Sequence, residues 1–175
     1  MGNELTFQDA ITKCNEWIRL WDKGEMGDQE LADAVGEVIQ QREGSRGFFV
    51  ASLTNDSNLM DQLPKALLTQ LQLGGDGIVD LTVRNLAMST AMEIHHGRNQ
   101  DQDLTDSSRR VQRRSQKLLL ALNPKAVKER LETMNSGLDG KGDDKDFISR
   151  WEYDDEQRNG VRQVIETTRA MIKSS

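Results

Sequence analysis

Residues 77–97 (GIVDLTVRNLAMSTAMEIHHG) carry apolar side chains on more than one side of a helical wheel. One stripe contains Val79, Val83, Leu86, Thr90 and Ile94, and a nearly opposite stripe contains Leu81, Met88 and Met92. A helix that is hydrophobic all round is a buried helix. The pattern therefore predicts the central helix of an all-α domain, with the other helices packed around it.

The segments before residue 77 have the same helical period. Apolar side chains repeat at intervals of three and four after Thr6, a second helix is expected from Asp28 to about Gln41, and a third after Pro64. Residues 42–47 are charged and contain glycine, so we expect a loop there. Residues 48–53 (FFVASL) are too few for periodicity to separate helix from strand, and we expect a helix in this all-α context.

After residue 97 the pattern predicts two solvated loops and three or more helices. The loops are residues 98–106 (RNQDQDLTD) and 137–146, and the expected helices are 107–122, a shorter one after Asn123-Pro124, and a last one beginning at Asp154 or Asp155. In total we predict seven to nine helices in a single domain over residues 1–175, with residues 1–5 flexible.

Composition excludes several classes of protein. A chain of 175 residues that is 35% hydrophobic can bury a core without a disulfide or a metal. A formal net charge of −6 argues against nucleic acid as the partner. The single cysteine, Cys14, suits a reducing compartment, and no window is apolar enough to span a bilayer. We therefore expect a soluble, cytoplasmic protein.

Five cations gather on one side of the helix expected at 107–122, and we call them the arginine face: Arg109, Arg110, Arg113, Arg114 and Lys117. Guanidinium groups pair well with carboxylates, so the face is a candidate docking surface for an acidic protein partner. The alternative is an ordinary solvated surface, partly neutralised by Asp101, Asp103 and Asp106.

Glu93, His95 and His96 form the second candidate site, because Glu-x-x-His places a carboxylate and an imidazole on one helix face. Di-iron bundles need this motif twice, and the chain has two histidines in all. The alternative is two histidines that interact with the dipole at the end of a helix. Neither GGDG (74–77) nor DGKGDDKD (139–146) fits a phosphate loop or an EF-hand. We therefore expect no metal and no cofactor.

Three segments resemble an uncharacterised cyanobacterial family of all-helical proteins: 83–92 (VRNLAMSTAM), 110–114 (RVQRR) and 147–157 (FISRWEYDDEQ). The resemblance covers about residue 47 to the C-terminus. It implies a bacterial, cytoplasmic setting and an accessory role in a photosynthetic cell. No activity is attached to the family, so the resemblance transfers no site residue.

Together, these patterns predict a non-catalytic helical accessory protein that binds a protein partner through the arginine face. The competing hypothesis is a helical bundle that binds a metal or a small ligand, or acts as an enzyme, through Glu93, His95 and His96. Association of the chain with copies of itself stays open.

Overall fold

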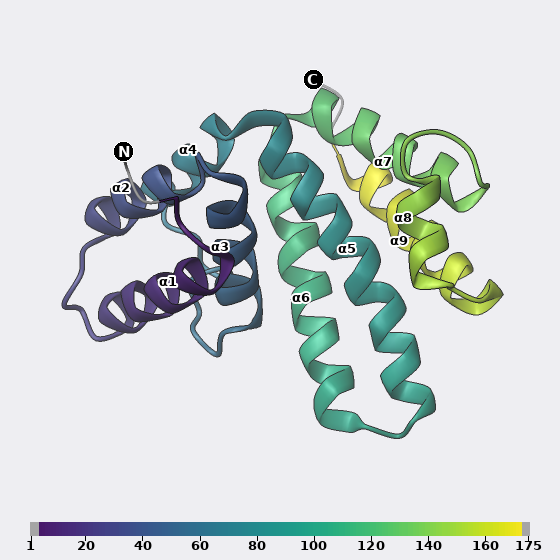
Figure 1. The fold of residues 1–175 in the computed structure, drawn as a ribbon, viewed down its shortest axis with the longest axis horizontal. Helices are drawn as coiled ribbons and strands as arrows, with labels where there is room; N and C mark the ends of the chain where they lie inside the picture. The colour runs from purple at the N-terminus through teal and green to yellow at the C-terminus, as the bar shows by residue number, and fades with distance from the viewer. Residues whose placement is uncertain (1–3, 173–175) are drawn as a thin grey trace. The chain divides into compact units, whose positions relative to one another are not determined.

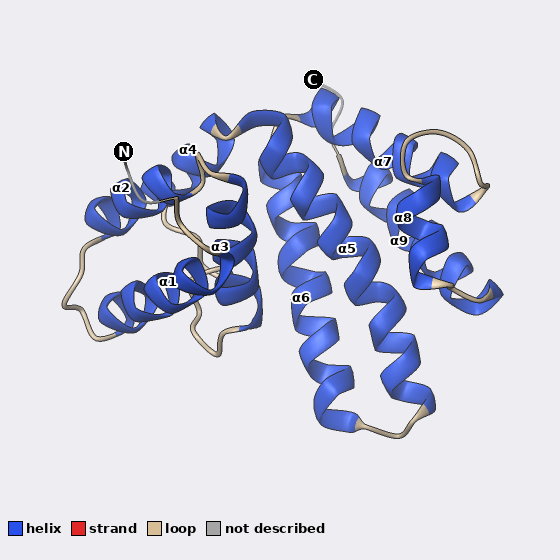
Figure 2. Ribbon diagram, viewed as in Figure 1, coloured by secondary structure: helices blue, strands red, loops and turns tan. Residues whose placement is uncertain are grey.

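The computed structural model describes residues 4–172. Over this range the chain forms nine helices, α1 to α9, and no strand (Figures 1 and 2). The all-α fold class and the expected number of helices are therefore confirmed. Within the same range, none of the helices combines the length and the hydropathy that a membrane span requires. Part of the flexible segment expected at residues 1–5 lies outside the described residues.

The chain divides into two compact units, Met1–Leu81 and Thr82–Ser175, and the division falls within α5. We name them unit 1 and unit 2. The expectation of one domain over residues 1–175 stays a prediction.

Unit 1 contains four complete helices: α1 (Phe7–Asp22), α2 (Asp28–Val38), α3 (Arg42–Thr54) and α4 (Lys65–Leu73). Helix α1 begins as predicted, because the Thr6 side chain accepts a hydrogen bond of 3.0 Å from the backbone N–H of Asp9. It ends just before Gly24, whose φ of +74° lies in the left-handed region that glycine adopts at no steric cost.

The core of unit 1 forms where α1 packs on α3 and α2 packs on α4. Its largest buried side chains are Ile18, Leu31, Phe48, Phe49, Leu53, Leu59, Leu67, Leu71 and Ile78. Cys14 of α1 is also buried.

The prediction of a loop at residues 42–47 is wrong, because these residues form the first half of α3. Gly44 and Gly47 are both buried there. A Cβ at Gly47 would meet the Cβ of Ala10 and the backbone of α1, so the missing side chain permits close helix packing. Residues 48–53 continue the same helix, as expected.

Helix α5 (Gly75–Arg98) confirms the long helix predicted over residues 77–97 and exceeds it by a few residues. Its two apolar stripes differ in burial. Val79, Val83 and Leu86 are buried, whereas Leu81 and Met88 are half-buried and Met92 is 37% exposed.

Unit 2 contains the rest of α5 together with α6 (Gln102–Ala121), α7 (Pro124–Leu138), α8 (Lys145–Trp151) and α9 (Asp155–Met171). The unit 2 part of α5 runs antiparallel to α6 (Figure 1). The loop expected at 98–106 is too long, because α6 begins at Gln102. The Asp101 side chain caps α6 by accepting a bond of 3.0 Å from Leu104 N–H.

The loop expected at 137–146 is also shorter in the structure. Helix α7 continues to Leu138, and α8 begins at Lys145. Asp144, expected in solvent, is 2% exposed and accepts two hydrogen bonds from Arg130, at 2.5 and 2.9 Å. This buried ion pair joins α7 to the start of α8, while residues 139–143 of the loop remain exposed to solvent.

Candidate functional site

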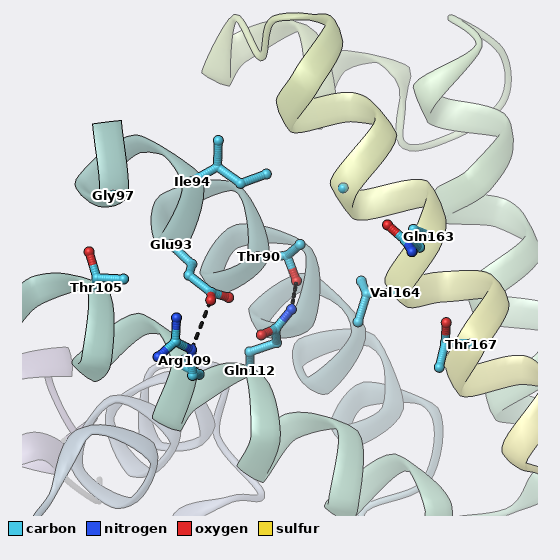
Figure 3. A pocket seen from close by; sticks show the side chains of 11 residues that line it. Thr90, Glu93, Ile94, Gly97, Thr105, Arg109, Gln112, Gln163, Val164 and Thr167 are labelled. Carbon is cyan, nitrogen blue, oxygen red and sulfur yellow. Dashed lines mark hydrogen bonds and ion pairs between the residues drawn. The ribbon is translucent and has the colours of Figure 1, made fainter. Parts of the chain in front are cut away.

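Three helices of unit 2 enclose a groove of about 460 Å³ (Figure 3). We call it the unit 2 groove. It is lined by Thr90, Glu93, Ile94 and Gly97 from α5, by Thr105, Arg109 and Gln112 from α6, and by Gly160, Gln163, Val164 and Thr167 from α9. Its volume is within the range of about 300–1,000 Å³ that small-molecule sites occupy.

The α5 and α6 walls are joined by an ion pair inside the groove. Nε of Arg109 donates to Oε1 of Glu93 at 2.9 Å (Figure 3). The Arg109 guanidinium also reaches Asp106, one turn earlier on α6, at 3.4 Å. Glu93 is 23% exposed and Arg109 is 54% exposed, so the carboxylate lies deeper than the guanidinium.

A second bond between the same walls lies one turn further along. The Gln112 amide donates to the Thr90 hydroxyl at 2.9 Å, and that hydroxyl donates to the backbone carbonyl of Leu86 at 2.7 Å (Figure 3). These two hydrogen bonds fix the Gln112 side chain and leave its carbonyl oxygen as an acceptor within the groove.

The α9 wall approaches α5 closely because Gly160 has no side chain. A Cβ at this position would lie 2.6 Å from Cδ1 of Ile94. The half-buried side chains of Ile94 and Val164 supply apolar surface, and the exposed side chains of Gln163 and Thr167 supply polar groups from α9.

Three further contacts hold α9 in place. Arg98 of α5 pairs with Asp154 at 2.5 Å and with Glu156 at 2.7 Å. Asp154 is also the N-cap of α9, in a capping box with Gln157. The hydrogen bond from Arg98, followed by that from Gln157 N–H, lowers the pKa of Asp154 to about 2. The Gln157 amide reaches the Ala91 carbonyl at 3.2 Å, so the first turn of α9 is anchored on α5.

The structure separates the members of the arginine face. Arg109 lines the unit 2 groove. Arg114 is 2% exposed, Arg110 is half-buried, and Arg113 and Lys117 are exposed. These last four side chains each make an interaction within the chain, so none of them is free.

Glu93, His95 and His96 do not converge on one point. Glu93 turns into the groove toward Arg109, whereas neither histidine lines it. His95 is exposed and contacts the Asn99 amide at 3.2 Å, and the two imidazole rings stack edge to face with centroids 5.4 Å apart. Among residues 4–172 there is no group of three or more His, Cys, Asp or Glu side chains that could hold a metal ion.

The sequence patterns missed most of the groove. Gln112, Gly160, Gln163 and Thr167 belong to no motif, and only the pairing of α5, α6 and α9 brings them together. Glu93 and Arg109 were each singled out, but for two different hypotheses, and sixteen residues separate them.

Comparison with known protein families identifies the family of this chain. Residues 6–168 match the family model described as Uncharacterised conserved protein UCP020893, which covers most of the chain. Nothing among the curated proteins or the solved structures matches the chain.

Proposed function

The chain belongs to the UCP020893 family, whose description names no activity, and we propose that it is a non-catalytic protein that binds a small polar ligand in the unit 2 groove. One observation carries this proposal. The groove places a carboxylate and a guanidinium 2.9 Å apart on two helices, beside polar and apolar side chains from a third.

Binding is favoured over catalysis by the chemistry of the lining. The described residues that line the groove include no histidine, cysteine or lysine. The hydroxyls of Thr90 and Thr105 donate to backbone carbonyls, at 2.7 Å in both cases, so neither is activated by a neighbouring base. The two charged groups neutralise each other, which suits recognition of polar groups.

The test is a thermal-shift screen against a library of small polar metabolites, followed by titration of each hit. A ligand that binds only the folded state raises the melting temperature, and the rise increases with the ratio of free ligand concentration to Kd. Thr167→Trp should abolish the shift, because the indole would fill the groove from the exposed side of α9. Thr69→Trp, at an exposed position of α4, is the matched control and should leave the shift unchanged. A library without a hit would overturn the proposal, as would hits that Thr167→Trp leaves intact.

A second candidate function is the docking of an acidic protein partner on the arginine face. It is supported by the exposure of Arg109, Arg113 and Lys117 along one side of α6. Arg113→Glu should abolish salt-sensitive capture of such a partner, whereas Arg19→Glu on α1 should not. Arg114 is unsuitable for this test. Its side chain is 2% exposed, so Arg114→Glu would bury a carboxylate and destabilise the fold.

For the setting of this activity we propose the cytoplasm of a cyanobacterial cell, as the resemblance of three segments implies. The cysteine content supports a reducing compartment, because a single cysteine cannot form a disulfide within the chain. Fractionation of the native cells with an antibody against the chain tests this localisation.

A further inference from the structure

The charged groups of the unit 2 groove are balanced. Of the described residues that line it, Glu93 and Arg109 are the only charged ones, and their charges are opposite. Their mutual contact uses Oε1 of Glu93 and Nε of Arg109, and Asp106 takes one bond from Nη1. Among the described residues, Oε2 of the carboxylate and Nη2 of the guanidinium make no hydrogen bond, so each group can still bind a ligand atom.

This balance selects a class of ligand. A ligand with only a negative charge would pair with Arg109 but would lie beside the Glu93 carboxylate. A ligand with only a positive charge would pair with Glu93 but would lie beside the Arg109 guanidinium. A zwitterion satisfies both groups, because its anionic end pairs with Arg109 and its cationic end with Glu93.

The rest of the lining suits the body of an amino acid or a short peptide. The Gln112 and Gln163 side chains end in amides, which match peptide N–H and C=O groups as donors and acceptors. Ile94 and Val164 offer apolar surface to an aliphatic side chain. The volume of about 460 Å³ has room for more than one residue.

We infer that the unit 2 groove recognises a zwitterionic α-amino acid or a short peptide, with its ammonium group on Glu93 and its carboxylate on Arg109. This inference rests on the proposed function, since it names the ligand class of the same groove.

The first experiment compares ligands. Each standard amino acid and a set of aliphatic dipeptides are titrated by calorimetry against the full chain, and the best binder is compared with its N-acetyl derivative and its methyl ester. Each derivative removes one charge and keeps the rest of the ligand. We expect each to bind about tenfold more weakly or worse, the loss typical of a charge-assisted hydrogen bond.

The second experiment compares variants. Glu93→Gln should remove the preference for the free ammonium over the N-acetyl group, and Arg109→Gln should remove the preference for the free carboxylate over the ester. The matched controls are Glu16→Gln and Arg19→Gln, an exposed ion pair on α1. They should change neither preference.

The outcomes separate this inference from the proposed function. In one outcome no amino acid or dipeptide binds, while the metabolite screen finds a different ligand whose binding Thr167→Trp abolishes. The inference of a zwitterionic ligand is then wrong, and the proposed binding function stands. Derivatives that bind as well as the parent ligand would also refute the zwitterion. If nothing binds in the groove, both fail.

Discussion

Gly47→Ala is a test of the packing of unit 1. The added Cβ would overlap the Cβ of Ala10 on α1 and lie 3.0 Å from the backbone nitrogen of Ile11 and from the carbonyl oxygen of Phe7. Because carbon atoms in contact are normally about 3.5–4.0 Å apart, α1 and α3 would have to separate by roughly 1 Å. The nearest atoms are the Cβ of Ala10 and backbone atoms of α1, so no flexible side chain can rotate away to relieve the overlap.

The magnitude follows from two opposing effects. Overpacking of a core costs about 1–3 kcal/mol, and the upper end applies here because the atoms that must move belong to the backbone and to Ala10. Alanine in place of glycine within a helix stabilises the folded state by about 1 kcal/mol through its higher helix propensity. We expect a net decrease of about 2 kcal/mol in the free energy of unfolding.

Urea denaturation followed by circular dichroism measures this change as a lower midpoint at an unchanged m-value. Gly77→Ala in α5 is the control. A Cβ there meets no atom within 4 Å, so this variant should be more stable than the parent by up to about 1 kcal/mol. A Gly47→Ala variant as stable as Gly77→Ala would refute the close packing of α1 on α3.

Three further predictions concern single polar groups. Because Arg98 lowers the folded-state pKa of Asp154 to about 2, its contribution to stability is complete above the unfolded pKa of about 3.9 and is lost as the pH falls toward 2. Asp154→Asn should therefore flatten this part of the acid-unfolding curve, and an unchanged curve would contradict the ion pair. The Ser115 hydroxyl is buried without a hydrogen-bond partner among the described residues, so Ser115→Ala should raise unfolding stability by about 1 kcal/mol; a loss of stability would show that the hydroxyl is bonded. Asp144→Asn should lower stability in urea by about 3 kcal/mol, because it removes the buried negative charge that pairs with Arg130, and a loss below 1 kcal/mol would argue against a buried pair.

The parts of the fold that the sequence predicted best are those set by neighbouring residues. Thr6, Asn123 and Asp154 each cap a helix by accepting a hydrogen bond from a backbone N–H three residues later. Such a signal is complete within one turn of the chain. The starts of α1, α7 and α9 could therefore be predicted without knowledge of the packing.

The errors arose where tertiary contacts override local composition. Residues 98–106 are polar enough to predict a loop, yet Thr105 is buried and Asp101 caps α6. Gly44 and Gly47 also suggested a loop, whereas their lack of a side chain permits close packing of α3. For Gly47 the deciding contact is with α1, which the local pattern does not contain, whereas the Asp101 cap is a local signal that the polar composition of residues 98–106 concealed.

The candidate site in the structure differs from the two predicted from the sequence for the same reason. Helical periodicity places five cations on one side of α6 but does not specify what lies opposite each of them. In the structure Arg114 is 2% exposed and Arg109 is 54% exposed, so members of one face meet different surroundings. Arg109 faces the carboxylate of Glu93, which the sequence assigned to a different hypothesis. A site that depends on the register between α5 and α6 becomes visible only once both helices are in place, and this pair is therefore the first target for mutation.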